Sequence, residues 1–179
     1  MAKLLVKKSS VPEAGLGLFT LEYIPKGSKI TIYPGKRISN QEYLNYLKDD
    51  PNNLDLYYVL EIDGLIIMAD HSSRVSNKLA HMANDISMID VSKYNFKDAI
   101  EYINSTELVN CSFSLDRESN IFYLIAEKDI SPNSELFVHY GVQYWLDIDS
   151  KKYSINFDEK NFLIKLDTDP EFYSMVLNK

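Results

Sequence analysis

The chain has 179 residues, 45% of them hydrophobic and 25% charged, which is ordinary for one soluble globular domain with a buried core. No run approaches the roughly 18 apolar residues that a membrane span needs, and the apolar stretch near Met1 is too short to predict a secretion signal. We therefore expect an intracellular protein with no membrane partner. The net charge of −7 disfavours direct binding to nucleic acid and is compatible with a basic peptide partner, although many proteins are mildly acidic for solubility alone.

The first fifty residues predict short β-strands followed by a helix. Short apolar segments are separated by Gly27 and by the Pro-Gly pair at 34–35, a pattern that is typical of strands joined by turns. Ser39 is an N-cap signal, and apolar residues then recur at helical spacing until Pro51 stops the pattern. The strands are expected over residues 4–6, 16–21 and 30–33.

Further strands are expected in the middle of the chain. Asp63-Gly64 is a strong hairpin turn signal and predicts a hairpin. The strands of this hairpin are expected over 56–62 and 65–68, those of a second hairpin over 111–115 and 121–126, and a last strand over 135–140. Helical segments are expected over 77–83, 95–102 and 170–177. The elements together predict a β-rich α+β fold of several short twisted sheets with few short helices.

Two later segments define a family resemblance. Residues 81–85 read His-Met-Ala-Asn-Asp, and residues 135–145 read Glu-Leu-Phe-Val-His-Tyr-Gly-Val-Gln-Tyr-Trp. Upstream and between them, in the same order as in the family, lie Gly-Leu-Gly-Leu-Phe at 15–19, Ile-Pro-Lys-Gly at 24–27, Tyr-Pro-Gly at 33–35 and Asn-Cys at 110–111. This ordered set resembles the signature blocks of SET-domain protein lysine methyltransferases. The resemblance implies a SET-domain fold.

The resemblance also implies a domain organisation. A SET-like catalytic domain is expected over residues 1–146, with an insertion at about 86–108, and a C-terminal extension over 147–179 is expected to pack on the same domain. Because Cys111 is the single cysteine, the chain lacks cysteine-rich zinc flanks and is similar to the small SET enzymes without them. The extension is the natural candidate to cover the cofactor, and a simple packing appendage is an equal alternative.

The activity that the resemblance implies is methyl transfer from S-adenosylmethionine to the side-chain amine of a protein lysine. The reaction needs a neutral amine, an in-line approach to the methyl group and the exclusion of water. An aromatic tunnel supplies all three, because burial lowers the pKa of a lysine and aromatic faces tolerate a methylated cation. The expected partner is a protein or peptide with an exposed lysine, with a histone tail among the candidates and a nuclear location in that case.

The resemblance assigns the residues that handle the substrate. Tyr140 matches the catalytic tyrosine, whose hydroxyl orients the amine; a surface-strand tyrosine is the alternative. Tyr33 matches a tyrosine of the lysine channel, although a core aromatic explains it about as well. Phe113 and Val138 fall where some relatives carry channel residues that restrict methylation. Because neither has a hydroxyl group, we expect room for di- or trimethylation.

The resemblance also assigns a cofactor-binding set. Asn84 matches the asparagine that grips the amino-acid end of the cofactor, and Asp85 stands where the usual residue is histidine. This departure either leaves a working pocket, through the backbone, or indicates a degenerate one. The full expected set is Gly15, Leu16, Gly17, Asn84, Asp85 and Trp145. A tight turn is the alternative explanation for Gly15 and Gly17, and a tryptophan of the core is the alternative for Trp145.

The histidines do not predict a metal site. His81 lies where some relatives also carry histidine, and a histidine at a capped helix end explains it slightly better. His71 and His139 have no partners at metal-ligand spacing, so no metal is expected.

Two other functions stay open on the sequence alone. A non-catalytic SET-like module that binds a peptide or partner protein is favoured if Asp85 blocks the pocket. An ordinary β-rich interaction domain unrelated to methylation is the third hypothesis. The sequence does not predict the oligomeric state.

Overall fold

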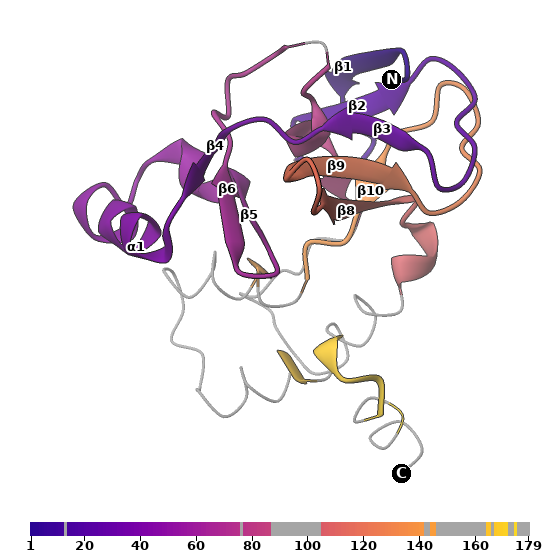
Figure 1. The fold of residues 1–179 in the computed structure, drawn as a ribbon. Coiled ribbons are helices and arrows are strands. Elements are labelled where there is room, and N and C mark those ends of the chain that lie inside the picture. The colour runs from indigo at the N-terminus through magenta and orange to yellow at the C-terminus, as the bar shows by residue number, and fades with distance from the viewer. Residues whose placement is uncertain are drawn as a thin grey trace. The chain divides into compact units, whose positions relative to one another are not determined.

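The computed structural model describes residues 1–12, 14–75, 77–86, 105–141, 144–145, 164–165, 167–171 and 174. The chain divides into two units, traced in Figure 1. The first unit contains Met1–Asn84 and Val109–Val138, and the second contains Asp85–Leu108 and His139–Lys179. Within the described residues, no helix is both long enough and apolar enough to cross a membrane.

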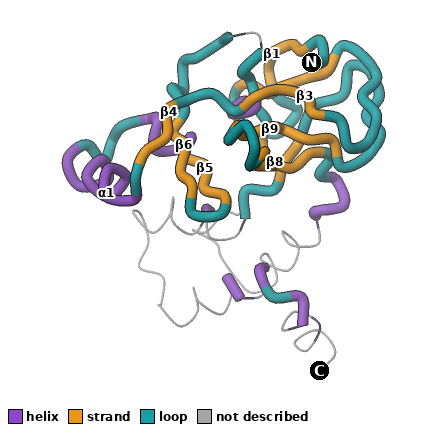
Figure 2. Tube along the Cα trace, viewed as in Figure 1, coloured by secondary structure: helices purple, strands orange, loops and turns teal. Residues whose placement is uncertain are grey.

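Small antiparallel sheets make up most of the first unit, as the orange segments of Figure 2 show. In the first sheet, β1 (Leu4–Lys8) pairs with β2 (Leu16–Thr20). The second has the order β3 (Lys29–Ile32), β9 (Ile121–Ala126) and β8 (Cys111–Asp116). The third has the order β4 (Lys36–Ile38), β6 (Leu65–Met68) and β5 (Val59–Ile62). A two-stranded sheet joins β10 (Phe137–Val138) and β7 (Asn84–Asp85). This strand-rich architecture confirms the predicted fold class.

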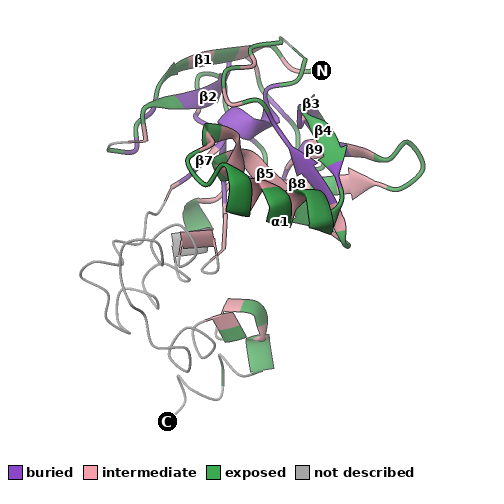
Figure 3. Cartoon of the chain, turned by 90° about the vertical axis from the view of Figure 1, so that its left-hand side faces the viewer, coloured by how far each residue is buried: buried purple, intermediate pink, exposed green. Residues whose placement is uncertain are grey.

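The central strand β9 pairs with β3 and β8 and has one face on the core. Its residues alternate between half-buried and buried positions, as expected for a strand with one face on the core. Phe122 and Leu124 on the buried face are 1% and 0% exposed. Figure 3 shows the buried stretches of β9 and β2 in purple. The side chains with almost no exposure are Phe122, Leu18, Ile30, Leu124, Leu136, Val138, Thr20 and Thr31.

Local sequence signals explain the hairpin turn before β6 and the helix α1. Asp63 and Gly64 both have positive φ, 55° and 75°, which is the conformation of a two-residue hairpin turn, so the predicted hairpin is confirmed. The helix α1 (Asn40–Asp49) begins after Ser39, whose hydroxyl accepts a hydrogen bond from the Glu42 backbone N–H while the Glu42 carboxylate accepts one from the Ser39 backbone. No residue of α1 is buried, and Figure 3 accordingly draws much of it in green.

Several predicted elements have different bounds in the structure. Residues 56–58 belong to the 3-10 helix η1 (Leu54–Tyr58) rather than to a strand, because Asn53 caps a helical turn through its side-chain oxygen. The strand predicted over 135–140 is reduced to β10, since the residues on either side make other hydrogen bonds. The other 3-10 helices are η2 (Ala80–Met82) and η4 (Ser105–Leu108). The predicted helix over 95–102 and most of the extension at 147–179 lie outside the described residues.

Candidate functional site

The two glycines at the start of β2 are required for different reasons. Gly15 has a φ of +72°, which residues with a side chain rarely adopt, and a Cβ atom there would meet no described residue within 4 Å. A Cβ atom on Gly17 would lie 2.0 Å from Oε1 of Glu135 and 3.1 Å from Nδ2 of Asn84. Gly15 therefore serves the backbone conformation, whereas Gly17 allows two side chains to approach the strand.

Asn84 is held against this glycine segment. Its Nδ2 donates to the backbone carbonyl of Leu16 at 2.9 Å and to Oε1 of Glu135 at 3.4 Å. With both amide hydrogens directed at these two acceptors, Oδ1 is the atom of the side chain that can accept a hydrogen bond from a ligand. The structure thus brings together Leu16, Gly17 and Asn84, three of the predicted cofactor-binding residues.

Glu135 is a member of this group that the sequence reasoning missed. It is 6% exposed, and its carboxylate accepts hydrogen bonds from Ser9 and Ser10 as well as from Asn84. A buried carboxylate is rare unless several donors satisfy it. The only signal in the sequence is one acidic residue directly before the apolar run 136–138.

Two of the predicted channel residues lie in ring contact. The Tyr33 and Phe113 rings meet edge to face, with centroids 5.4 Å apart. Tyr33 is 5% exposed, and its hydroxyl donates to the Tyr58 carbonyl at 3.0 Å, which are also the features of a core aromatic. Val138, the third predicted channel residue, lies on β10 and is 1% exposed.

His81 is a buried histidine beside these rings. Its ring centroid lies 6.3 Å from that of Tyr33 and 5.9 Å from that of Tyr58. Nε2 lies 3.1 Å from the Ser73 carbonyl, so it carries the proton, and Nδ1 has no hydrogen-bond partner within the described residues. Burial, together with the charge of Arg74, lowers the pKa of His81 to about 4. The side chain is therefore neutral at physiological pH.

Asp85 forms hydrogen bonds with two aromatic residues of the second unit. Its Oδ2 accepts a hydrogen bond from the backbone N–H of Tyr140 at 2.9 Å and another from the indole N–H of Trp145 at 3.1 Å. Asp85 is 3% exposed. The Tyr140 ring stacks on Trp145 with centroids 5.9 Å apart and contacts Tyr144 edge to face at 4.7 Å. Asp85, the residue that departs from the family pattern, thus binds the predicted catalytic tyrosine and Trp145, one of the predicted cofactor-binding residues.

An ion pair lies next to Tyr140 in the sequence. Nε2 of His139 is 3.1 Å from Oδ1 of Asp167. Burial by itself lowers the pKa of His139, but the hydrogen bond to Asp167 and the charges of Asp167 and Asp85 outweigh it, and the pKa is raised. The protonated form of His139 is therefore favoured in this unit.

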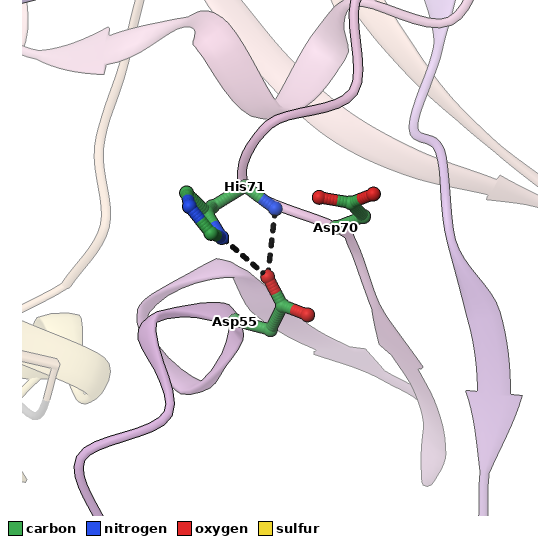
Figure 4. A group of neighbouring side chains, drawn as sticks. All are labelled: Asp55, Asp70 and His71. Carbon is green, nitrogen blue, oxygen red and sulfur yellow. Dashed lines mark hydrogen bonds and ion pairs between the residues drawn. The ribbon is translucent and has the colours of Figure 1, made fainter.

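Three potential metal ligands meet elsewhere in the first unit (Figure 4). One ligand atom from each of Asp55, Asp70 and His71 lies within 4.8 Å of the others. This group was not predicted from the sequence, because Asp55 is distant from the other two residues along the chain. Oδ1 of Asp55 accepts hydrogen bonds from the His71 backbone and ring, both at 2.8 Å, so the group acts as a link between η1 and the loop after β6.

The comparisons with known proteins agree with this arrangement. The family model of the SET domain matches residues 15–141, which is more than half of the chain. No curated protein matches the sequence. The match spans the glycine segment, Asn84, Asp85 and Tyr140, so the chain belongs to the SET-domain family.

Proposed function

We propose that the protein is a protein-lysine N-methyltransferase that uses S-adenosylmethionine. SET domains are typical of this class of enzyme. The observation that carries the proposal is the amide of Asn84, which donates to the carbonyl of Leu16, because by resemblance Asn84 matches the asparagine that grips the cofactor in the family. Substrate, cofactor and catalysis are the parts that experiments must test.

The chemistry of this group fits the amino-acid end of the cofactor. That end carries an ammonium group, which needs acceptors, and Oδ1 of Asn84 is such an acceptor beside the exposed backbone of Leu16. Gly15 leaves open space where a side chain would stand. When bound, S-adenosylmethionine supplies a methyl group on a positively charged sulfur.

Tyr140 is proposed to orient the lysine amine through its hydroxyl. Its backbone is fixed by Asp85, and its ring packs against Tyr144 and Trp145, so the side chain has few alternative positions. Such preorganisation is what near-attack geometry requires. In this reading Asp85 replaces the usual histidine as a structural acceptor and leaves a working site.

Tyr33 and Phe113 are proposed as walls of the lysine channel. Apolar and aromatic walls disfavour the ammonium form of a lysine and so favour the nucleophilic amine. Because Phe113 and Val138 lack hydroxyl groups, di- or trimethylated products are proposed. Phe113→Tyr is expected to shift products towards monomethyl-lysine, and mass spectrometry of a methylated peptide gives the readout. An unchanged product distribution would remove this argument.

The substrate is proposed to be a basic segment of a protein, with histone tails as the first candidates. The net charge of −7 supports a basic partner. If the substrate is a histone, the protein is proposed to act in the nucleus.

Titration calorimetry with S-adenosylmethionine tests the proposal first. We expect saturable binding by the intact protein and its loss in Asn84→Ala. Asn45→Ala is the matched control, because Asn45 is an exposed asparagine of α1 that pairs with Gln41. A methylation assay on a histone mixture with Tyr140→Phe follows. No binding by the intact protein would reject the enzyme and favour the non-catalytic SET-like module.

A further inference from the structure

Glu135 has a rigid backbone position and an enclosed side chain. The Leu136 backbone N–H donates to the Leu18 carbonyl at 2.7 Å, and Glu135 forms an isolated β-bridge with Phe19. The side chain is directed at Gly17, where its Oε1 fills the space that a Cβ atom would need. The carboxylate therefore lies flush against β2, and the missing side chain of Gly17 is what admits it.

Donors from two distant segments converge on this carboxylate. Oε1 accepts from the Ser9 hydroxyl at 2.6 Å and from Nδ2 of Asn84 at 3.4 Å. Oε2 accepts from the backbone N–H and the hydroxyl of Ser10, at 2.8 Å and 2.6 Å. The serines are 125 and 126 residues away in sequence, and Asn84 is 51 away. Hydrogen bonds to a buried charged group are stronger than neutral ones, and they are costly to leave unmade.

This arrangement decides which end of the Asn84 amide faces outward. The oxygen and nitrogen of an asparagine amide have almost the same shape, so only hydrogen bonding selects between the two flipped positions. Here the Leu16 carbonyl and Oε1 of Glu135 are both acceptors, and both lie at the same end of the amide. Nitrogen must occupy that end, because an oxygen there would face two acceptors. Oδ1 is thereby directed away from Glu135.

We propose that Glu135 is a positioning residue that fixes the Asn84 amide, so that Oδ1 receives the ammonium group at the amino-acid end of the cofactor. The inference rests on the proposed function for the identity of the ligand. For the orientation of Asn84, it rests on the hydrogen bonds of that amide to Glu135 and to the Leu16 carbonyl. The hydroxyl groups of Ser9 and Ser10 hold the carboxylate in place.

Glu135→Gln tests this role with two related ligands. A glutamine has an NH₂ group where one carboxylate oxygen was, and when that group faces Asn84 it favours the flipped amide. S-adenosylhomocysteine has an amino-acid end and 5′-methylthioadenosine has none. We expect roughly tenfold weaker binding of S-adenosylhomocysteine and less than about twofold change for 5′-methylthioadenosine. Equal losses for both ligands would mean a general structural defect and would overturn the proposal.

Glu127→Gln is the matched control. Glu127 also accepts a hydrogen bond from a serine hydroxyl, that of Ser112, at an exposed position. We expect no selective loss of either ligand in this variant. If Glu135→Gln does not fold, Ser9→Ala replaces it, because it removes one donor from the same Oε1 and keeps the carboxylate. A smaller loss, roughly threefold, is then expected for S-adenosylhomocysteine alone, and the absence of any selective loss would overturn the proposal.

A measurement without ligand separates this inference from the proposed function. The side-chain amide signals of Asn84 in a ¹⁵N correlation spectrum, assigned with Asn84→Ala, respond to the hydrogen-bond partners of that amide. We expect them to shift in Glu135→Gln and to remain in place in Glu127→Gln. Unchanged signals in Glu135→Gln would overturn the positioning role. Shifted signals in a protein that binds neither ligand would support the role of Glu135 and reject the methyltransferase.

Discussion

The two units each contain a buried carboxylate that binds predicted site residues, and the two differ in how they are built. Glu135 in the first unit collects donors from segments more than fifty residues away and fixes an amide side chain. Asp85 in the second unit uses one oxygen to bind a backbone N–H and an indole N–H. The first arrangement orients a polar group that can bind a ligand, whereas the second fixes aromatic rings. A buried carboxylate can thus orient a polar group or fix aromatic rings.

Removing the carboxylate of the second unit is expected to have the largest effect. Asp85→Ala leaves the Tyr140 N–H and the Trp145 indole without this acceptor, and we expect a loss of about 3 kcal/mol in the free energy of unfolding. Because Trp145 is the single tryptophan, its fluorescence reports the change directly and should shift to the red. Asp85→Asn keeps an oxygen acceptor and should lose about 1 kcal/mol. Equal losses in both variants would contradict the hydrogen-bond explanation.

Crowding the carboxylate of the first unit is expected to have the next largest effect. In Gly17→Ala the new Cβ would lie 2.0 Å from Oε1, so Glu135 must move, and we expect a loss of about 2 kcal/mol by urea unfolding. The same substitution in a Glu135→Ala background should have little further effect, because the space is then empty. Additive losses would show that Gly17 is required for another reason.

Acid is expected to affect the two units in opposite directions. His81 has a pKa of about 4 in the folded protein, below the ordinary 6.5, so the unfolded chain binds more protons between pH 6.5 and 4. The contribution of neutral His81 to the free energy of unfolding is complete above pH 6.5. About 2 kcal/mol of this free energy should be lost as the pH falls from 6.5 to 4. The pKa of His139 is raised in the folded protein. Its pairing with Asp167 therefore contributes fully to stability below pH 6.5, and this contribution is lost as the pH rises through the pKa of the folded protein.

Variants separate the two histidines in that experiment. His81→Gln should flatten the fall in stability between pH 6.5 and 4, and His139→Gln should remove the loss at higher pH. Chemical denaturation at several pH values measures both. If His81→Gln leaves the acid slope unchanged, a different group is responsible for it.

The smallest effect is expected for an exposed hydrogen-bond pair. Ser39 and Glu42 exchange hydrogen bonds at the start of α1, on a helix with no buried residue. Ser39→Ala should lower the free energy of unfolding by about 1 kcal/mol, as for a typical N-cap. A loss as large as that of Asp85→Ala would contradict the view that burial gives the two carboxylates their importance.

Local signals in the sequence predicted the elements that depend on neighbouring residues. The Asp63-Gly64 turn, the N-cap at Ser39 and the strand over 121–126 were all readable because their determinants lie within a few positions. The strand predicted over 56–62 was partly wrong, because the Asn53 cap favours a helical turn at its start. Apolar residues alone do not distinguish these two outcomes.

The candidate site was predictable only where the family motif names a residue. Asn84, Asp85, Tyr140 and Trp145 were found in this way, and the structure brings Asp85, Tyr140 and Trp145 together. Glu135 was missed because its serine partners are 125 and 126 residues away in the chain. A long-range network of this kind has no local pattern to reveal it.

The close fit of Gly17 and Glu135 also has an evolutionary consequence. A side chain at position 17 and the carboxylate of residue 135 in its present position cannot coexist, because the new Cβ atom would displace the carboxylate. The two positions should therefore covary among related chains, so that a shorter or absent acid at 135 accompanies any residue larger than glycine at 17. Selection therefore acts on positions 17 and 135 together.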